Sequence, residues 1–428
     1  MAGSADGGRP VVPLRMAFVP SNSSQMGKFG TIMEALRARG DDVRAINVDA
    51  AYEPVFAAAT QIESSGFPFE RLPDSRFDPN GHWLRQIAQK PHLERAFASV
   101  LERIEPDVLV FGNDSFVSGR TFVRAARRRG IATVLIPDGL VVPPNTRHRM
   151  SAWGTMRDGM AQFIRRLFHA GGPRGLSGVD GILLINSMGR DVLARQGVAP
   201  RRIHVVGSPE YDRLAQTWRR EGDAEEDRDL RRRLGIPQGR PVILLAHQPL
   251  DGRERALIGT IVSAARLHEA VVLTKFHPRG REDPASWRSW AAREGMSAAE
   301  THFVVAECTS IEAVRLASVC VTAYSTVSLE ALVCGVPLVL VQYLNTPFAL
   351  AYGREYGAAL EAGSPRELVE AITAILTSEA TRARLATGRV AAIHGELHDL
   401  DGKSVERTMD AIDHVVAEAR GRGRGARS

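Results

Sequence analysis

Short apolar runs alternate with amphipathic stretches along most of the chain, and this rhythm predicts strands and helices in turn. Continuous apolar runs bounded by helical patterns are typical of buried parallel strands. The sequence therefore predicts an α/β fold in two halves. The predicted strands lie at 14–20, 42–48, 107–112, 132–136, 181–186 and 203–207 in the first half, and at 242–246, 270–275, 321–323 and 337–343 in the second.

The stretch at 321–340, VTAYSTVSLEALVCGVPLVL, has the most informative pattern. It predicts a strand end, a polar turn at 324–326, a helix at 327–334 that stops at Gly335, and a second strand at 337–341. A helix of two turns is not stable alone, so two buried strands must hold it. Its N-terminus is then expected at the carboxyl ends of those strands.

That helix N-terminus offers backbone N–H groups and the positive end of the helix dipole, which suits a phosphate. Ser325 and Thr326 precede the helix, and Glu330 lies one turn into it, where a carboxylate can receive ribose hydroxyls. The alternative is that Ser325 or Thr326 only caps the helix and that the negative charge of Glu330 only interacts favourably with the helix dipole. A capping box would need its acid or amide at position 328 or 329, so that box does not account for Glu330.

In the first half, candidate residues lie where predicted strands end. A loop, SNSSQMGKFG, separates the first strand from a helix predicted at 29–39. Because the loop contains Gly27 and Lys28, we expect its backbone to come close to a ligand on the acceptor side. The alternative is a plain tight turn. Asp114 and Asp138 follow later strands, at the edge where parallel sheets bind ligands, with a loop cap as the alternative for each.

In the second half, a polar group follows two neighbouring predicted strands. His247 and Gln248 follow the first of these strands, which is predicted at 242–246. The next strand ends in Lys275, and His277 and Pro278 follow it. A histidine at such a strand end is either a ligand to phosphate or a packed side chain, and both readings stay open for the two histidines.

The pattern also predicts the organisation of the chain. We expect a flexible leader at 1–13, an N-terminal domain at 14–217, a charge-dense linker and helix at 218–239, a C-terminal domain at 240–402, a C-terminal helix at 403–420 and a basic disordered tail at 421–428. The ligand is expected in the cleft between the two domains.

Composition narrows the class of protein. The chain has 428 residues, 44% hydrophobic and 24% charged, which suits a globular protein with more than one core. Its three cysteines are too far apart for a zinc site, and no apolar run is long enough for a signal peptide or a membrane span, so a cytoplasmic protein is expected. The chain has a net charge of +6, but its basic residues are scattered among acidic ones, which argues against nucleic acid as a partner. The amphipathic run at 157–168 predicts either packing on its own domain or contact with the inner face of the membrane.

Segments of the second half resemble the GT-B glycosyltransferases, in the order of that family. They are VVGSPEYDRL at 205–214, LGIP at 234–237, KFHP at 275–278 and STVSLEALVCGVP at 325–337. The resemblance implies two Rossmann-like domains facing across a cleft, with a nucleotide-sugar held mainly by the C-terminal domain. It also implies that Gly207, at the start of GSPEYDRL, lies on the donor side.

Three pairs within that fold resemble the set found in inverting bacterial sialyltransferases and Kdo transferases. They are Asp138 with Gly139, His277 with Pro278, and Ser325 with Thr326. The resemblance implies that Asp138 is the general base and that His277, Ser325 and Thr326 contact the donor phosphate. Asp138 departs from the pattern because Pro137 stands where an acid is often found, and it occupies the place of the His-Gly of teichoic-acid glycerophosphotransferases. The run EALxxGxP is shared with UDP-sugar and GDP-sugar transferases, so CMP and UDP both stay open as the donor nucleotide.

Chemistry and resemblance together predict a glycosyltransferase of the kind used in polysaccharide biosynthesis. It would move a sugar from a nucleotide donor to a hydroxyl of a glycan, lipid or small-molecule acceptor. No D-x-D motif follows a predicted strand, so we expect no metal, and no cofactor beyond the nucleotide-sugar co-substrate. The alternatives are a CDP-glycerol-type glycerophosphotransferase, a UDP-N-acetylglucosamine 2-epimerase, and a non-catalytic nucleotide-binding or scaffold protein.

Overall fold

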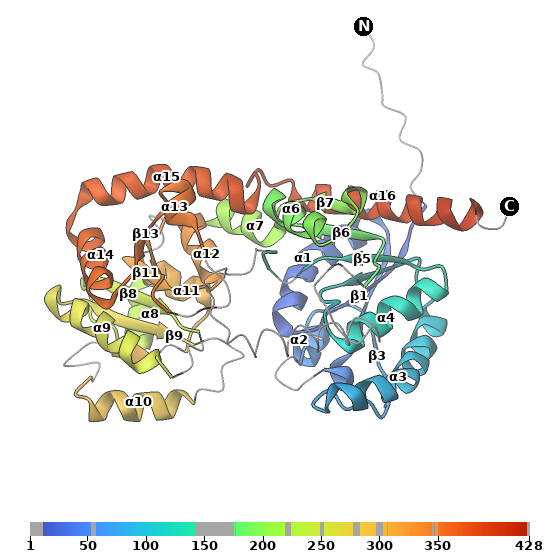
Figure 1. Cartoon of the computed structure of the whole chain (residues 1–428), viewed down its shortest axis with the longest axis horizontal. Helices are drawn as coiled ribbons and strands as arrows, with labels where there is room; N and C mark the ends of the chain where they lie inside the picture. Colours follow the sequence, from blue (N-terminus) through green and yellow to red (C-terminus); the bar gives the residue numbers. More distant parts are fainter. Residues whose placement is uncertain are drawn as a thin grey trace, which may run out of the picture.

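The chain folds into two lobes, each built around one parallel sheet (Figure 1). The computed structural model describes residues 12–52, 57–137, 139–141, 175, 177–218, 224–248, 252–276, 283–296, 303–305, 307–344, 346 and 350–425.

The first sheet has seven strands in the order β3-β2-β1-β4-β5-β6-β7 among the described residues, and every neighbouring pair is parallel. Its strands are β1 (Arg15–Val19), β2 (Asp42–Asn47), β3 (Phe69–Arg71), β4 (Val108–Phe111), β5 (Ala132–Leu135), β6 (Gly181–Leu184) and β7 (Ile203–Val205).

The second sheet has six described strands in the order β10-β9-β8-β11-β12-β13, again all parallel. Its strands are β8 (Val242–Ala246), β9 (Val271–Lys275), β10 (Phe303–Val305), β11 (Val319–Thr322), β12 (Leu338–Val341) and β13 (Ala359–Ala362). The predicted α/β architecture in two halves is therefore confirmed.

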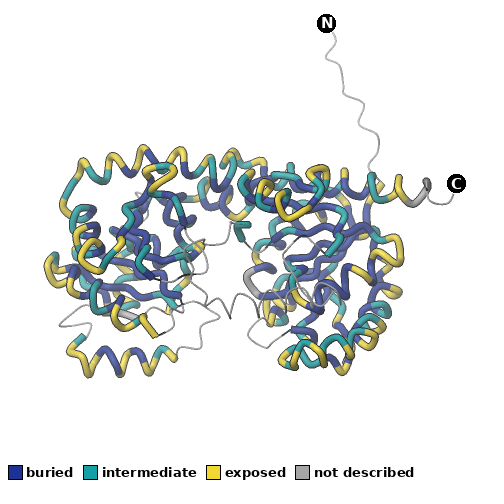
Figure 2. The backbone as a smooth tube through the Cα atoms, in the orientation of Figure 1, coloured by how far each residue is buried: buried dark blue, intermediate teal, exposed yellow. Residues whose placement is uncertain are grey.

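Helices cover both faces of each sheet, because strands that are apolar on both sides must be buried on both sides. Figure 2 shows the buried backbone concentrated in the two sheets and the exposed positions on the outer helices. The helices are α1 (Ser23–Arg39), α2 (Ala59–Ser64), α3 (Trp83–Ile104), α4 (Val117–Arg128), α6 (Ser187–Arg195), α7 (Pro209–Thr217), α8 (Ala224–Leu234), α9 (Glu254–Leu267), α10 (Pro284–Arg293), α11 (Ser310–Leu316), α12 (Val327–Cys334), α13 (Tyr352–Tyr356), α14 (Pro365–Thr377), α15 (Glu379–Leu397) and α16 (Ser404–Gly425), with short 3-10 helices η1 (Asp49–Ala51) and η3 (Pro200–Arg202).

The helix α12 has the bounds that the sequence predicts. It ends at Gly335, which adopts φ 73° as a left-handed C-cap, and β12 follows after Pro337. Five of its apolar side chains, from Leu329 to Cys334, join the core beneath it. This burial supplies the stability that a two-turn helix lacks by itself.

The C-terminal helix α16 crosses from the second lobe back to the first, where it packs on β5 and β6 (Figure 1). Ile412 and Val415 are buried in the core of the first sheet, and such side chains contribute about 1.5–3 kcal/mol each on burial. The helix continues to Gly425, beyond the predicted end at 420, so the prediction that the tail begins at 421 is wrong. Arg420 and Arg422 bind Asp107 and Asp180 at 2.9 and 2.7 Å, and these ion pairs extend the helix along the first lobe.

The predicted glycine loop at 21–30 is also wrong, because α1 begins at Ser23 and contains Gly27, Lys28 and Gly30. The Oδ1 atom of Asn22 accepts the N–H of Gln25 at 2.9 Å, and Gln25 Oε1 accepts the N–H of Ser21 at 2.7 Å. This reciprocal capping starts the helix earlier than the glycines suggest. The two glycines therefore lie inside a helix and do not form a ligand loop.

Within the described ranges, none of the helices combines the length and the apolar character that a membrane span requires.

Replacing helical glycines by alanine should change the free energy of unfolding in opposite directions in α1 and α15. A Cβ at Gly27 or Gly30 meets no heavy atom within 4 Å, so Gly27→Ala and Gly30→Ala should each raise the free energy of unfolding by about 0.5–1 kcal/mol. A Cβ at Gly388 in α15 would lie 2.4 Å from the backbone of Tyr356 and Gly357, so Gly388→Ala should lower it by about 1–3 kcal/mol. Urea denaturation measures all three. A destabilised Gly27→Ala protein would contradict the early start of α1.

Candidate active site

The N-terminus of α12 lies at the carboxyl edge of the second sheet, next to the ends of β8 and β11. Thr322 at the end of β11 donates its hydroxyl to Ala246 O at 3.1 Å and accepts the N–H of Ser325 at the same distance. The buried Ser325 in turn accepts the N–H of Val327 at 3.3 Å and, at its carbonyl, the N–H of Ser328 at 3.1 Å. Ser325 therefore shapes the turn into α12 and uses part of the first-turn N–H groups that the sequence offered to a phosphate.

Thr326 is the residue of this turn that faces outward. It is exposed, it stands at the N-cap position, and its side chain makes no capping hydrogen bond. Its hydroxyl is thus available to a ligand at the positive end of the helix dipole.

Glu330 is held in a mostly apolar environment one turn into α12. Burial raises the pKa of its carboxyl to about 7, although a hydrogen bond from Ser310 at the start of α11 lowers it. The Oε2 atom is buried and has no hydrogen-bond partner among the described residues. One carboxylate oxygen is therefore fixed by the protein, and the other can accept a hydroxyl from a ligand.

Charged groups from both lobes surround Glu330. Glu210 of α7 raises the pKa of Glu330, whereas Lys28 of α1 and Lys275 of β9 lower it. The Lys28 ammonium lies 3.5 Å from the carboxylate of Glu210. Because α7 contacts both α1 and α12, it brings the first lobe's Lys28 to the second lobe's Glu330. Lys28 therefore reaches the site from within a helix, whereas Gly27 on the same helix is exposed and has open space around it.

The loop after β5 reaches the same helix end. Gly139 has φ 125°, which favours glycine, and a Cβ there would lie 3.8 Å from Cγ2 of Thr326. Leu140 packs against the apolar core that contains α12. Asp138, the predicted base, lies outside the described residues. Its neighbour in the sequence, Gly139, nevertheless faces Thr326 of the predicted phosphate-binding turn.

The polar residues after β8 are buried, and His247 packs against aromatic rings. The ring of His247 lies 4.7 Å from that of Phe276 and 5.9 Å from that of Trp287, between centroids, and its backbone N–H donates to Lys275 O at 2.9 Å. This packing is the alternative that the sequence left open for His247. Gln248 is buried as well, and its Oε1 has no partner among the described residues.

Two predicted residues serve the backbone in this structure. Asp114 is fully buried and accepts the N–H groups of Gly175 at 3.0 Å and Ser177 at 3.2 Å, so it fixes the chain ahead of β6. Gly207 has φ 81°, and a Cβ there would lie 3.1 Å from Nη2 of Arg407. Gly207 therefore permits the close approach of α16 to the end of β7.

The structure brings Lys275 and Lys28 near Glu330, one turn from Thr326. The contacts described for Asp114 and Gly207 are with other segments, the chain ahead of β6 and Arg407 of α16. His277, Pro278 and the amphipathic run at 157–168 lie outside the described residues. Sequence reasoning missed Glu210 and Ser310. Glu210 lies in the quoted segment GSPEYDRL, but no spacing rule links it to Glu330, which is 120 positions away.

Comparison with known proteins finds a matching family model within the first lobe. Residues 29–209 match the model of the glycosyl transferase 4-like domain. Among curated proteins, no sequence matches the chain.

Solved structures with the same fold include epimerases and a transferase. The UDP-GlcNAc 2-epimerase from Neisseria meningitidis bound to UDP-GlcNAc has a TM-score of 0.61 at 11% identity, with 93% of this chain and 99% of that chain covered. The Methanocaldococcus jannaschii UDP-GlcNAc 2-epimerase in complex with UDP-GlcNAc and UDP has a TM-score of 0.60 at 16% identity, with the same coverage. A glycosyltransferase from Rickettsia africae has a TM-score of 0.61 at 10% identity, with 94% and 99% covered. The chain therefore has a GT-B-like fold of two Rossmann-like domains.

The raised pKa of Glu330 predicts a dependence of stability on pH. Its folded pKa of about 7 lies above the ordinary value of 4.5, so the folded protein binds more protons between these values and loses stability as pH rises through them. Over this window Glu330 should account for a loss of up to about 3 kcal/mol. Glu330→Gln should flatten the slope of unfolding free energy against pH, measured by urea denaturation.

The exposed Glu294 provides the matched control for this prediction, and Glu294→Gln should keep the slope of the unaltered protein. Burial also raises the pKa of Glu396 to about 7, but this contribution is common to all three proteins and cancels in the differences. An unchanged slope in Glu330→Gln would show that Glu330 is ionised at low pH like an exposed carboxyl.

Proposed function

We propose that the protein is a glycosyltransferase that binds a UDP-sugar at the N-terminus of α12. The observation that carries the proposal is Glu330, whose buried Oε2 has no hydrogen-bond partner in the part of the chain that the structure describes, while Thr326 is exposed one turn away. A ribose hydroxyl donating to Oε2 would place the nucleotide phosphates beside Thr326 and the positive helix end. The match of residues 29–209 to a glycosyl transferase domain supports the reaction class.

The choice of UDP rests on analogy with proteins of the same fold. The Neisseria and Methanocaldococcus structures contain UDP-GlcNAc, and the latter also UDP. CMP, which the sialyltransferase and Kdo-transferase resemblance favours, is the alternative that the binding experiment distinguishes.

Lys275 and Lys28 supply positive charge to the proposed donor site. Both lower the pKa of Glu330, so both ammonium groups are close enough to act on charge at that position. In the proposed reaction they would stabilise the nucleotide diphosphate as it leaves, together with His277 and Thr326. Asp138, adjacent to the loop that contacts Thr326, would remove the proton of the acceptor hydroxyl. That the reaction needs no metal remains a prediction.

Nucleotide binding should depend on Glu330 and on pH. An ionised carboxylate is a stronger acceptor for a ribose hydroxyl than a protonated one, so affinity for UDP should rise as pH increases through about 7. Glu330→Gln should weaken UDP binding about 10- to 100-fold and remove this pH dependence, because a hydrogen bond to a charged group is worth about 1.5–3 kcal/mol. Calorimetric titration with UDP and CMP measures both effects.

The outcomes of that titration separate the candidate functions. Glu294→Gln is the control and should bind like the unaltered protein. If CMP binds more tightly than UDP, CMP is the donor nucleotide. The absence of binding by any of CMP, CDP, UDP, GDP and ADP would refute the donor site and favour a scaffold protein.

Asp138 is tested by a charge-neutralising change. Asp138→Asn should lower the rate of transfer about 10²- to 10⁴-fold and leave the affinity for nucleotide unchanged, because a general base acts on the acceptor and not on the donor. The exposed Asp191 of α6 gives the control variant Asp191→Asn, which should keep full activity. Full activity in Asp138→Asn would assign the base to another residue.

A UDP-N-acetylglucosamine 2-epimerase is the second candidate. The Neisseria and Methanocaldococcus UDP-GlcNAc 2-epimerases share the fold over 93% of this chain. The two reactions differ in their need for an acceptor. An epimerase acting on UDP-GlcNAc in deuterated water would produce the C2 epimer with solvent deuterium at C2 and UDP still attached in the product, with no net release of UDP. A transferase would release UDP only when an acceptor is present.

A further inference from the structure

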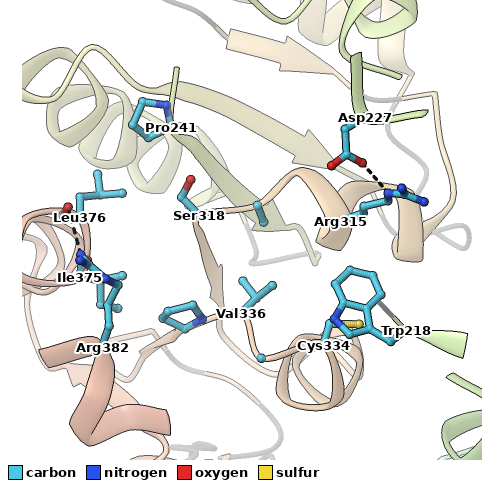
Figure 3. Close-up of a pocket in the computed structure, with 13 residues that line it drawn as sticks. Trp218, Asp227, Pro241, Arg315, Ser318, Cys334, Val336, Ile375, Leu376 and Arg382 are labelled. Atoms are coloured by element: carbon cyan, nitrogen blue, oxygen red, sulfur yellow. Dashed lines mark hydrogen bonds and ion pairs between the residues drawn. The ribbon is translucent and has the colours of Figure 1, made fainter. Parts of the chain in front are cut away.

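A cavity of about 460 Å³ lies in the second lobe at the edge of the sheet opposite the candidate active site (Figure 3). Pro241, Ser318 and Pro337 line it, and they directly precede β8, β11 and β12. The residues of the candidate active site follow the carboxyl ends of the same strands. The cavity is therefore separate from that site, and α12 spans the distance between them with Cys334 at the cavity end.

The cavity combines apolar walls with polar groups at its sides. Val336 and Ile375 contribute apolar surface, and Trp218, the residue after α7, lies beside Cys334 (Figure 3). Its volume is within the range of about 300–1,000 Å³ that is usual for small-molecule sites. Space and surface therefore suit a small organic ligand.

Two hydrogen-bond donors of the lining have no acceptor among the residues that the structure describes. The Nε1 atom of Trp218 is buried and has no partner among the described residues. Ser318 Oγ accepts the N–H of Val242 at 3.2 Å, which leaves its own O–H to donate. A buried donor without an acceptor destabilises the folded protein, so an acceptor supplied by a ligand would relieve that cost.

Arg382 gives the cavity its uncompensated positive charge. Its Nη1 donates to the carbonyls of Ile375 at 2.8 Å and Leu376 at 3.3 Å, and no described carboxylate forms an ion pair with it. Arg315, the other arginine of the lining, is paired with Asp227. Figure 3 shows Arg382 and Trp218 on opposite sides of the cavity. The lining thus offers a cation on one side and an N–H donor on the other.

We propose that this cavity binds a small organic anion with a compact apolar body and a second acceptor group. Arg382 would receive the anionic group, a carboxylate or a phosphate monoester, and Trp218 Nε1 would donate to the second acceptor. The apolar body would lie against Val336 and Ile375. This site is independent of the nucleotide-sugar site and does not rest on the proposed function.

Four probes separate the parts of this proposal. They are 4-hydroxyphenylacetate, 4-hydroxyphenyl phosphate, phenylacetate without the second acceptor, and the neutral 4-hydroxyphenylacetamide. We expect saturable binding of at least one hydroxylated anion to the full chain at millimolar concentration or below, measured by calorimetry and ligand-observed NMR. The amide should bind at least about 10-fold more weakly than the matching acid. A preference between the two hydroxylated anions identifies the anionic group as carboxylate or phosphate.

Variants test each contact. Arg382→Gln should weaken both hydroxylated anions about 10-fold or more. Arg384→Gln removes the same charge from an exposed position of the same helix, and it should have no effect. Trp218→Phe keeps an aromatic ring but removes the N–H, so it should weaken 4-hydroxyphenylacetate about 3- to 10-fold and leave phenylacetate unchanged. Far-UV circular dichroism melts establish that each variant is folded, and Trp218→Phe breaks no hydrogen bond with a described residue.

Three results would overturn the proposal. One is the absence of saturable binding by either hydroxylated anion at millimolar concentration. Another is equal affinity for the acid and its amide. The third is unchanged affinity for the hydroxylated anions in folded Arg382→Gln and Trp218→Phe.

Discussion

The burial of α12 is the interaction on which the candidate site depends. A helix of eight residues cannot persist in water, yet α12 holds its bounds because its apolar side chains fill the core under β11 and β12 and it contacts α7, α11 and α15. That packing fixes Thr326 and Glu330 in space at one end. At the other end, Cys334 and Gly335 form part of the cavity that precedes β8, β11 and β12.

The same packing couples the two lobes. The helix α7 contacts α12 and α1, so the Lys28–Glu210 pair is brought to Glu330, and Leu140 from the first lobe packs on the core of the second. The helix α16 returns to the first sheet, and Asp212 of α7 accepts the N–H of Ser404 at its start at 2.9 Å. Burial raises the pKa of Glu330 to about 7, and charged groups from both lobes then modify it, Glu210 upward and Lys28 and Lys275 downward.

The site was predictable where chemistry and secondary structure coincide in a short stretch. The turn at Ser325 and Thr326, the helix, its Gly335 stop and the position of Glu330 all follow from local rules, and the structure confirms these elements. The prediction of a glycine loop at 21–30 was wrong because capping by Asn22 and Gln25 outweighed the flexibility that glycine suggests. Asp114 was placed correctly at a strand end, but its hydrogen bonds with Gly175 and Ser177, some 60 positions away, depend on the fold.

By itself, the sequence determined the two parallel α/β halves and most strand positions. The reason is that a buried parallel strand is apolar along its whole length, whereas a helix that covers the sheet is apolar on one face only. It also determined the bounds of α12, since a glycine stop and a strand-turn-helix pattern act over a few residues. Only the tertiary structure decided that α16 crosses to the first lobe, that Lys28 and Glu210 approach Glu330, and that Trp218 and Arg382 line one cavity. These contacts join residues far apart in the chain, and their energies arise from desolvation and charge proximity that no local pattern encodes.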